Sequence, residues 1–440
     1  MQITPLDTWI SKKIGAVPLR PAGLLSRPAL EDWQLQKLNE TLALARSKSP
    51  FYRQHLSAMP QTLTSLDELS QFPFTTPDQV RANPLRFVCV SQDDIQRVVT
   101  LQSSGTTGEP KRIYFTAADQ ELTIDFFGVG MSTFTQPTDR VLIFLPGDTP
   151  GSVGDLLRLG LLHQGREPLP YGPVRDPLEA LEKISSLRAN CLVGSPTQML
   201  GLARRAQQQS LAGNPISFAP DSLLLSTDYV PAAITHELKS IWGCQVFNHY
   251  GATEMGLGGG VECQAHRGLH LREADLFFEV VHHQTGEPLP EGDTQPGEVV
   301  FTTLTRRGMP LIRYRIGDRS RFIPGGCPCG STLKTLELVS GRFNGFVQVG
   351  KQLLRLPDFD EALFPIPALL NYSLTISGQP GRENLHIETQ MLTSEPASHL
   401  VQAALQAMPG LNPFQITIDC RHNPTEAGSL LKRGFLDKRG

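Results

Sequence analysis

A segment rich in glycine and in hydroxyl side chains lies between two short apolar runs that are expected to be strands. Two glycines permit tight backbone folding, four hydroxyls donate hydrogen bonds and a lysine adds positive charge, a combination that suits the phosphates of a nucleotide. The GxxxxGK(S/T) spacing of a Walker P-loop is absent, and a strand rather than a helix is expected to follow. By composition alone, a Ser/Gly-rich hairpin turn is an equal alternative. The segment reads Ser103, Ser104, Gly105, Thr106, Thr107, Gly108, Glu109, Pro110 and Lys111.

Two further short motifs combine a tyrosine, a glycine and a carboxylate. Tyr250-Gly251-Ala252-Thr253-Glu254 ends a β-rich run, and Tyr314-Arg315-Ile316-Gly317-Asp318 lies in a later one. Carboxylate oxygens together with nucleotide phosphates suit a hard divalent cation. Taken singly, the first motif is also explained by a glycine turn after a strand, and the second by a turn that its aspartate stabilises.

These three motifs, followed by Gly341-Arg342, occur in the order of the adenylate-forming superfamily and resemble its phosphate loop and its YGxTE, YRxGD and GR motifs. That superfamily comprises acyl- and aryl-CoA ligases, adenylation domains and luciferases. Within it the chain most resembles phenylacetate-CoA ligases, through SPFYR ending at Arg53, LTSLDELSQFPFTTPDQVR and VECQAHRGLHLREADL. The resemblance covers about residues 30–345 and thins out afterwards.

The resemblance implies a site for ATP and Mg²⁺ built from these motifs. It implies that Thr253 binds the α-phosphate, Glu254 holds Mg²⁺ and Asp318 accepts hydrogen bonds from both ribose hydroxyls, as an ionised carboxylate does well. It also implies that Tyr250 and the segment 226–228 lie along the adenine. The nucleotide-binding residues expected in this way are Ser103, Ser104, Gly105, Thr106, Thr107, Gly108, Lys111, Ser226, Thr227, Asp228, Tyr250, Gly251, Ala252, Asp318 and Arg342.

The sequence departs from the family pattern at two places. At the hinge that follows Arg342, Asn344-Gly345 stands where phenylacetate-CoA ligases have acidic residues, although Asn-Gly remains a flexible turn. Near the C-terminus, Ser429 stands where the family has a lysine that stabilises the adenylation transition state. Lys432 takes that catalytic role if the local alignment slips by three residues, and is otherwise a solvated tail charge. Both alternatives stay open.

Cysteine and histidine residues gather after the second and third motifs. Thiolate and imidazole ligands in a four-coordinate set suit structural zinc, and Cys-Pro-Cys-Gly makes a tight turn that can present two sulfurs to one ion. Some members of this ligase branch carry such a set. Reduced, unligated cysteines are the alternative, and His266 is a substitute for His270. The expected zinc ligands, which would clamp the loop after Glu254 to the loop after Asp318, are Cys263, His270, Cys327 and Cys329.

The elements that must position these residues follow from the hydrophobic pattern. An amphipathic helix is expected from Pro28 until Ser49-Pro50 ends it. Continuous apolar runs then alternate with helical stretches, which indicates a parallel sheet buried on both faces. After residue 274 the pattern becomes antiparallel β. We therefore expect an α/β fold: a large N-terminal domain, 1–340, of mixed and parallel sheets with helices plus a β subdomain, and a small, mobile α+β domain, 341–440, that swings.

Length and charge exclude several classes of protein. A chain of 440 residues is long enough for two to four domains. A net charge of −3 provides no general attraction to nucleic acid or anionic lipid. No apolar run reaches the roughly 18 to 20 residues of a membrane span, and the seven scattered cysteines argue for reduced thiols, so a cytoplasmic protein is expected. Dimerisation is expected only from the resemblance.

The function that the resemblance implies is ATP-dependent ligation of a carboxylic acid to CoA, through acyl-AMP and then the thioester. One alternative is an adenylating enzyme that delivers the acyl group to a carrier protein or an amine. Another is a regulatory homologue that keeps the nucleotide pocket without turnover, which the altered hinge and the missing lysine favour. The acid is unspecified, although Phe126 and Phe127 suggest an apolar cavity.

Overall fold

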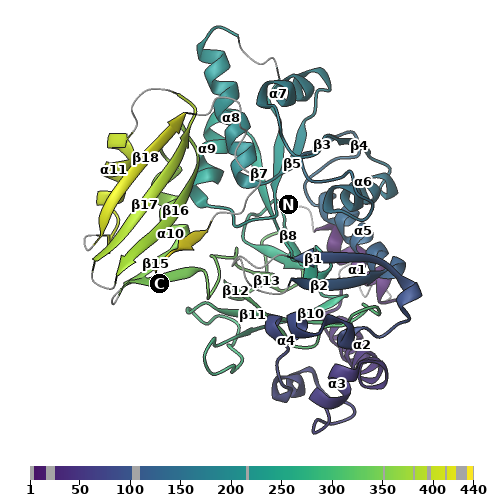
Figure 1. The fold of residues 1–440 in the computed structure, drawn as a ribbon. Coiled ribbons are helices and arrows are strands. Elements are labelled where there is room, and N and C mark those ends of the chain that lie inside the picture. The colour runs from purple at the N-terminus through teal and green to yellow at the C-terminus, as the bar shows by residue number, and fades with distance from the viewer. Residues whose placement is uncertain are drawn as a thin grey trace. The chain divides into compact units, whose positions relative to one another are not determined.

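The computed structural model describes residues 4–15, 25–101, 110–214, 218–349, 352–379, 382–393, 398–411, 414–422 and 434–439. The chain forms two compact units (Figure 1). Unit 1 contains Met1–Pro137, Thr149–Arg166 and His249–Val339; unit 2 contains Thr138–Asp148, Glu167–Asn248 and Ser340–Gly440. None of the helices among the described residues is long and apolar enough to cross a membrane.

Most helices of unit 1 begin at side chains that accept hydrogen bonds from the first turn, whereas Ser152, which precedes α6, makes no such bond. The predicted long helix is α2, Arg27–Lys48, and it ends at Ser49, whose hydroxyl in turn caps α3, Pro50–His55. The hydroxyl of Thr116 and the carboxylate of Asp119 form a reciprocal capping box that begins α5. The other helices are α1, Pro5–Lys13; α4, Pro77–Ala82; α5, Ala117–Met131; and α6, Val153–His163.

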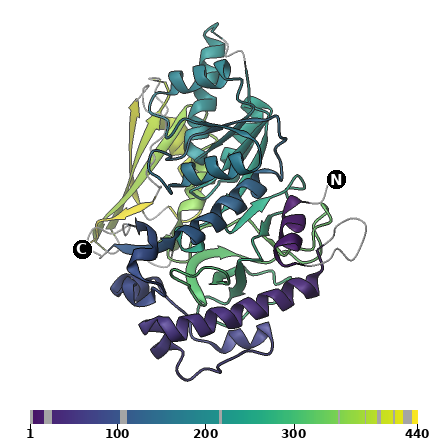
Figure 2. The same ribbon diagram turned by 90° about the vertical axis from the view of Figure 1, so that its right-hand side faces the viewer.

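The antiparallel β structure predicted after residue 274 is confirmed in unit 1. Strands β10, Leu276–Val281, β11, Gly297–Thr303, and β12, Tyr314–Ser320, form a three-stranded antiparallel sheet. Figure 2 shows α2 alongside this sheet, and the Thr41 hydroxyl on α2 donates to the carbonyl oxygen of Leu304 at 2.9 Å. The remaining strands are the hairpin β1, Ile95–Leu101, and β2, Lys111–Thr116, with the short strands β8, Gly260–Glu262, β9, Leu269–Leu271, and β13, Thr335–Leu336.

The predicted parallel sheet forms the centre of unit 2. Its neighbouring strands, in spatial order, are β7, Gln245–Tyr250; β6, Ser222–Leu225; β5, Cys191–Gly194; β3, Arg140–Ile143; and β4, Glu167–Pro170. Strands β5 and β6 are buried throughout, which explains their continuous apolar sequences. The helices of this part are α7, Pro177–Ser186; α8, Pro196–Leu211; and α9, Ala232–Trp242. The last two residues of β7 belong to unit 1, where they pair with β8.

The C-terminal part of unit 2 is the predicted α+β structure. A four-stranded sheet has the order β18-β17-β16-β19 (Figure 1). The strands are β16, Leu369–Gln379; β17, Arg382–Met391; β18, Gln415–His422; and β19, Phe435–Asp437, preceded by the hairpin β14, Phe346–Val349, and β15, Gln352–Arg355. Helices α10, Leu356–Leu363, and α11, Ser398–Gln406, complete it.

Unit 2 has a continuous core that joins this C-terminal part to α8 and α9. Leu200 and Leu238 share one buried cluster with Leu374. The buried guanidinium of Arg204 on α8 donates to the carbonyl oxygens of Phe364 and Leu369. Residues 340–440 therefore belong to the same compact unit as α8 and α9, while their predicted mobility stays a prediction.

Candidate active site

Three polar side chains from distant parts of the sequence meet in unit 1. Lys111 begins β2, Glu254 lies in a short 3₁₀ turn after β7, and Tyr314 begins β12. The Lys111 ammonium forms an ion pair with Glu254 and donates to the Tyr314 hydroxyl at 3.0 Å. That hydroxyl donates to Oε1 of Glu254 at 3.2 Å. We call these three residues the phosphate-side cluster, because the glycine-hydroxyl segment of the sequence leads directly into Lys111.

The phosphate-side cluster favours an ionised carboxylate. Glu254 is 6% exposed, and this burial acts to raise its pKa. The charge of Lys111 and the hydrogen bonds from Lys111 and Tyr314 outweigh that effect, so the pKa of Glu254 is lowered. An ionised, buried carboxylate is the kind of ligand that Mg²⁺ prefers.

Arg306 and Asp119 hold the surroundings of Glu254. Arg306 donates to the Glu254 carbonyl oxygen at 2.9 Å and to the Tyr114 carbonyl oxygen at 3.0 Å. Burial lowers the pKa of Arg306 to about 10, which still leaves the guanidinium protonated at neutral pH. The Asp119 carboxylate accepts from the backbone amides of Arg307 and Gly308 at 2.9 and 3.0 Å. The turn that carries Arg306 is thus fixed to the start of α5.

The expected adenine and ribose residues of unit 1 also meet. The Tyr250 hydroxyl donates to Oδ2 of Asp318 at 2.9 Å. Between Tyr250 and Glu254 the chain must turn closely past Leu257. A Cβ atom at Gly251 would lie 2.0 Å from the Leu257 carbonyl oxygen, so glycine is required there for space.

The remaining expected nucleotide ligands are not in this group. Ser226, Thr227, Asp228 and Arg342 belong to unit 2. Thr227 has φ of 74°, a left-handed conformation that is strained for a β-branched residue and that occurs often at binding sites. Ser103, Ser104, Gly105, Thr106, Thr107, Gly108 and Lys432 lie outside the described residues. The roles expected for all of these residues stay predictions.

The four expected zinc ligands lie together in unit 1, and we call them the metal knuckle: Cys263, His270, Cys327 and Cys329. One ligand atom from each lies within 4.8 Å of all the others, and all four residues are buried. Sγ of Cys263 is 3.7 Å from Sγ of Cys327, and Nε2 of His270 is 3.4 Å from Sγ of Cys329. His266, the alternative ligand, is outside this group, with Nδ1 3.9 Å from Oε1 of Glu262.

The donor atoms of the metal knuckle fit a tetrahedral thiophilic cation. Three sulfurs and one imidazole nitrogen are a known zinc set. The pKa of Cys329 is lowered, mainly because the Cys263 thiol donates to it, while the pKa of Cys263 is raised for the same reason.

Sequence reasoning missed Tyr314, Arg306 and Asp119 as supports of Glu254. Tyr314 opens the third motif, for which the resemblance assigns a role to Asp318 and none to the tyrosine hydroxyl. Nothing in the spacing of Arg306 and Asp119 shows that they meet near Glu254, because their partners are backbone groups far away in the sequence.

Comparisons with known proteins show which family and which relatives the chain resembles. A family model described as AMP-binding enzyme matches residues 30–304. Phenylacetate-coenzyme A ligase of Pseudomonas putida is 27% identical over 372 residues, covering 78% of this chain and 80% of that protein. Phenylacetate-coenzyme A ligase of Escherichia coli (strain K12) is 24% identical over 432 residues, covering 94% and 96%.

Solved structures support the same fold. A crystal structure of 2-hydroxyisobutyryl-CoA ligase in the postadenylation state has a TM-score of 0.75 at 18% identity, covering 92% of this chain and 89% of that one. A crystal structure of an anthranilate CoA ligase has a TM-score of 0.52 at 15% identity, covering 90% and 78%. The predicted α/β fold class is confirmed.

Replacing Gly251 by alanine should disturb the turn that carries Glu254. The added methyl group would meet backbone rather than a flexible side chain, so we expect the free energy of unfolding to fall by about 1–3 kcal/mol. Urea denaturation measures this loss. Gly434→Ala is the matched control, because its Cβ atom meets nothing within 4 Å. Equal stability of the two variants would contradict the crowded turn.

Proposed function

Since this chain belongs to the AMP-binding enzyme family, we propose that it is an ATP-dependent carboxylate–CoA ligase of the phenylacetate-CoA ligase type. In the first step a carboxylate oxygen attacks the α-phosphorus of ATP, which forms acyl-AMP and releases pyrophosphate. In the second step the CoA thiolate attacks the acyl carbon, and AMP leaves. No nucleophile from the protein is required.

The observation that carries this proposal is the phosphate-side cluster. A partly buried cation, an ionised carboxylate and a tyrosine hydroxyl converge in the unit that also contains the Tyr250–Asp318 pair. Such fixed charges can stabilise the charge that develops on phosphate without reorganising solvent. This arrangement supports phosphoryl chemistry on a nucleotide.

We assign the roles within the site by the motif resemblance. Lys111 and the segment before it would hold the phosphates, Thr253 the α-phosphate, and Asp318 the ribose. Mg²⁺, held by Glu254, would supply positive charge to the phosphates. Ser226, Thr227 and Asp228 with Tyr250 would lie along the adenine, Arg342 would contact ribose and phosphate, and Lys432 would assist adenylation.

Zinc in the metal knuckle is a structural part of the same proposal. The knuckle joins the segment after Glu254 to the segment after Asp318. Its four protein ligands would leave no open coordination position on the ion, and the proposed reaction does not need one. The ion would hold those two segments together.

We further propose that residues 341–440 form a mobile domain. Its rotation between the two steps would have to break the hydrogen bonds from Arg204 to Phe364 and Leu369, and those from the backbone amides of Ala232 and Ala233 to the Glu361 carboxylate. A cytoplasmic location and a homodimer are parts of the proposal that rest on the sequence and the resemblance alone.

Isotope exchange between ATP and pyrophosphate tests the function. With a panel of aryl and short acyl acids, we expect exchange that depends on the acid, and we expect CoA to be consumed with the acids that support it. Exchange without CoA consumption would instead favour a carrier-protein or amine acceptor. Nucleotide binding without exchange for any acid would favour the regulatory alternative and contradict a ligase.

Replacing Tyr314 by phenylalanine should slow adenylation. The change removes the hydroxyl that joins Lys111 to Glu254, and a hydrogen bond to a charged group contributes about 1.5–3 kcal/mol. We therefore expect the acid-dependent exchange rate to fall about 10- to 100-fold. Tyr114→Phe, on β2 but outside the phosphate-side cluster, is the control. An exchange rate that Tyr314→Phe leaves unchanged would count against the cluster.

Elemental analysis tests the metal. We expect one zinc per purified chain, lost in a Cys327→Ser, Cys329→Ser double variant because two thiolate ligands are removed. Cys420→Ser, which lies outside the metal knuckle, should keep the zinc. Wild-type protein without zinc, when purified with zinc supplied, would contradict the site.

A further inference from the structure

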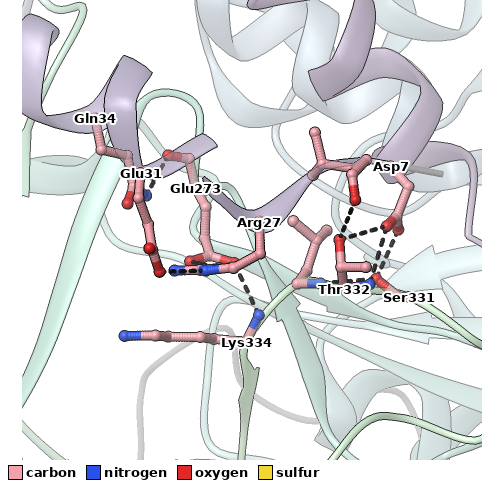
Figure 3. Close-up of polar contacts among 10 residues, drawn as sticks. Asp7, Arg27, Glu31, Gln34, Glu273, Ser331, Thr332 and Lys334 are labelled. Carbon is pink, nitrogen blue, oxygen red and sulfur yellow. Dashed lines mark hydrogen bonds and ion pairs between the residues drawn. The ribbon is translucent and has the colours of Figure 1, made fainter. Parts of the chain in front are cut away.

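A buried carboxylate in the first turn of α1 binds the loop that follows the metal knuckle. Asp7 is 0% exposed. Its Oδ2 accepts from the Ser331 hydroxyl at 2.6 Å, and its Oδ1 accepts from the Thr332 backbone amide at 3.1 Å (Figure 3). Burial of a carboxylate is costly unless hydrogen bonds compensate it, so this position of Asp7 depends on the 331–332 loop.

Ser331 connects Asp7 to a ligand of the metal knuckle. Its hydroxyl binds Asp7, and it lies two positions after the ligand Cys329, whose pKa its backbone amide helps to lower. Asp7 also interacts electrostatically with both Cys329 and His270. Only one residue therefore separates the Asp7 carboxylate from a ligand sulfur. On His270, Nε2 faces the sulfurs, while the buried Nδ1 has no hydrogen-bond partner among the described residues.

A second carboxylate binds the other side of the knuckle to α2. Glu273, shortly after His270, accepts from the Lys334 backbone amide at 2.8 Å and from Nη1 of Arg27 at 2.7 Å (Figure 3). The Gln34 side chain donates to the Glu273 carbonyl oxygen at 2.8 Å. The strand residue after Lys334 pairs directly with His270. Both chain segments that carry knuckle ligands are thus tied to N-terminal helices.

Helix α1 also contacts the side of unit 1 that includes α5. The Trp9 ring lies 6.3 Å from the Phe126 ring, measured between centroids, and Lys13 pairs with Asp275 at 2.8 Å. These contacts involve neither Asp7 nor any ligand of the metal knuckle. The position of α1 therefore depends on two sets of contacts: those of Asp7 with the 331–332 loop, and those of Trp9 and Lys13.

We propose that Asp7 is a positioning residue for the metal knuckle, and that metal binding and the docking of α1 stabilise each other. This inference rests on the proposed zinc site. Asp7 orients Ser331, Ser331 orients Cys329, and an oriented thiolate binds the ion with less loss of conformational freedom. Residues that orient ligands in this way contribute about 10- to 100-fold to metal affinity. By linkage, a bound ion must favour the docked helix by the same factor.

Zinc affinity of Asp7 variants tests the first half of the inference. Competition with a chromogenic chelator would be measured for the full chain and for Asp7→Asn, Asp7→Ala and Ser331→Ala. We expect each variant to bind zinc about 10- to 100-fold more weakly. Asp7→Asn keeps the size of the side chain, and Ser331→Ala removes the same hydrogen bond from the other partner, so a folding defect in one variant does not decide the outcome. Asp78→Asn, which changes an exposed residue of α4, should bind zinc as the wild type does.

Hydrogen exchange tests the second half. Removal of zinc should speed exchange in residues 5–13 and leave α7 of unit 2 unchanged. A purely structural role for Asp7 predicts lower stability with unchanged zinc affinity, and that result would overturn the inference. Unchanged exchange in α1 on zinc removal would also overturn it. Wild-type protein that binds no zinc would overturn both this inference and the proposed metal site, whereas zinc bound equally by all variants would overturn the inference alone.

Discussion

The ion pair between the partly buried Lys111 and the buried Glu254 is the interaction on which the candidate active site depends. Two charges removed from water are stable only if they compensate each other and are hydrogen-bonded, and Tyr314 provides the further bonds to both. The pair joins the start of β2, the turn after β7 and the start of β12. Each of the two charges is compensated by the other in this structure. The positive charge of Lys111 also suits a phosphate, and the negative charge of Glu254 suits a cation, which are different parts of Mg²⁺-bound ATP.

The frame around this pair in unit 1 is built mainly from hydrogen bonds to backbone groups. Arg306 binds the carbonyl oxygen of Glu254, and Asp119 binds the amides of the turn that carries Arg306. Asp7 and Glu273 likewise accept hydrogen bonds from backbone amides in the segment that follows the metal knuckle. Buried charged side chains thus fix loops whose backbone groups have no partners in a helix or sheet. The position of the Glu254 side chain therefore depends on turns that such hydrogen bonds hold in place.

In unit 2 the C-terminal part is held to helices α8 and α9 by an apolar core and by hydrogen bonds. Its C-terminal strands share an apolar core with α8 and α9, and Arg204 and Glu361 add hydrogen bonds across that core. The proposed movement of residues 341–440 between the two steps would have to break these contacts. The stability of these contacts therefore bears directly on how readily residues 341–440 can move.

The sequence alone determined the fold class, the order of the motifs and the three cysteines of the metal knuckle, and it left the histidine open between His270 and His266. Local patterns carry this information: continuous apolar runs become parallel strands because both faces are buried, and Ser49 ends one helix and caps the next. Only the tertiary structure decided that His270 rather than His266 joins the three cysteines, because strand β9 directs His270 into the knuckle. It also decided that Tyr314, Arg306, Asp119 and Asp7 support the two sites. Their partners are distant in sequence and are often backbone atoms, which leave no residue-specific pattern in the chain.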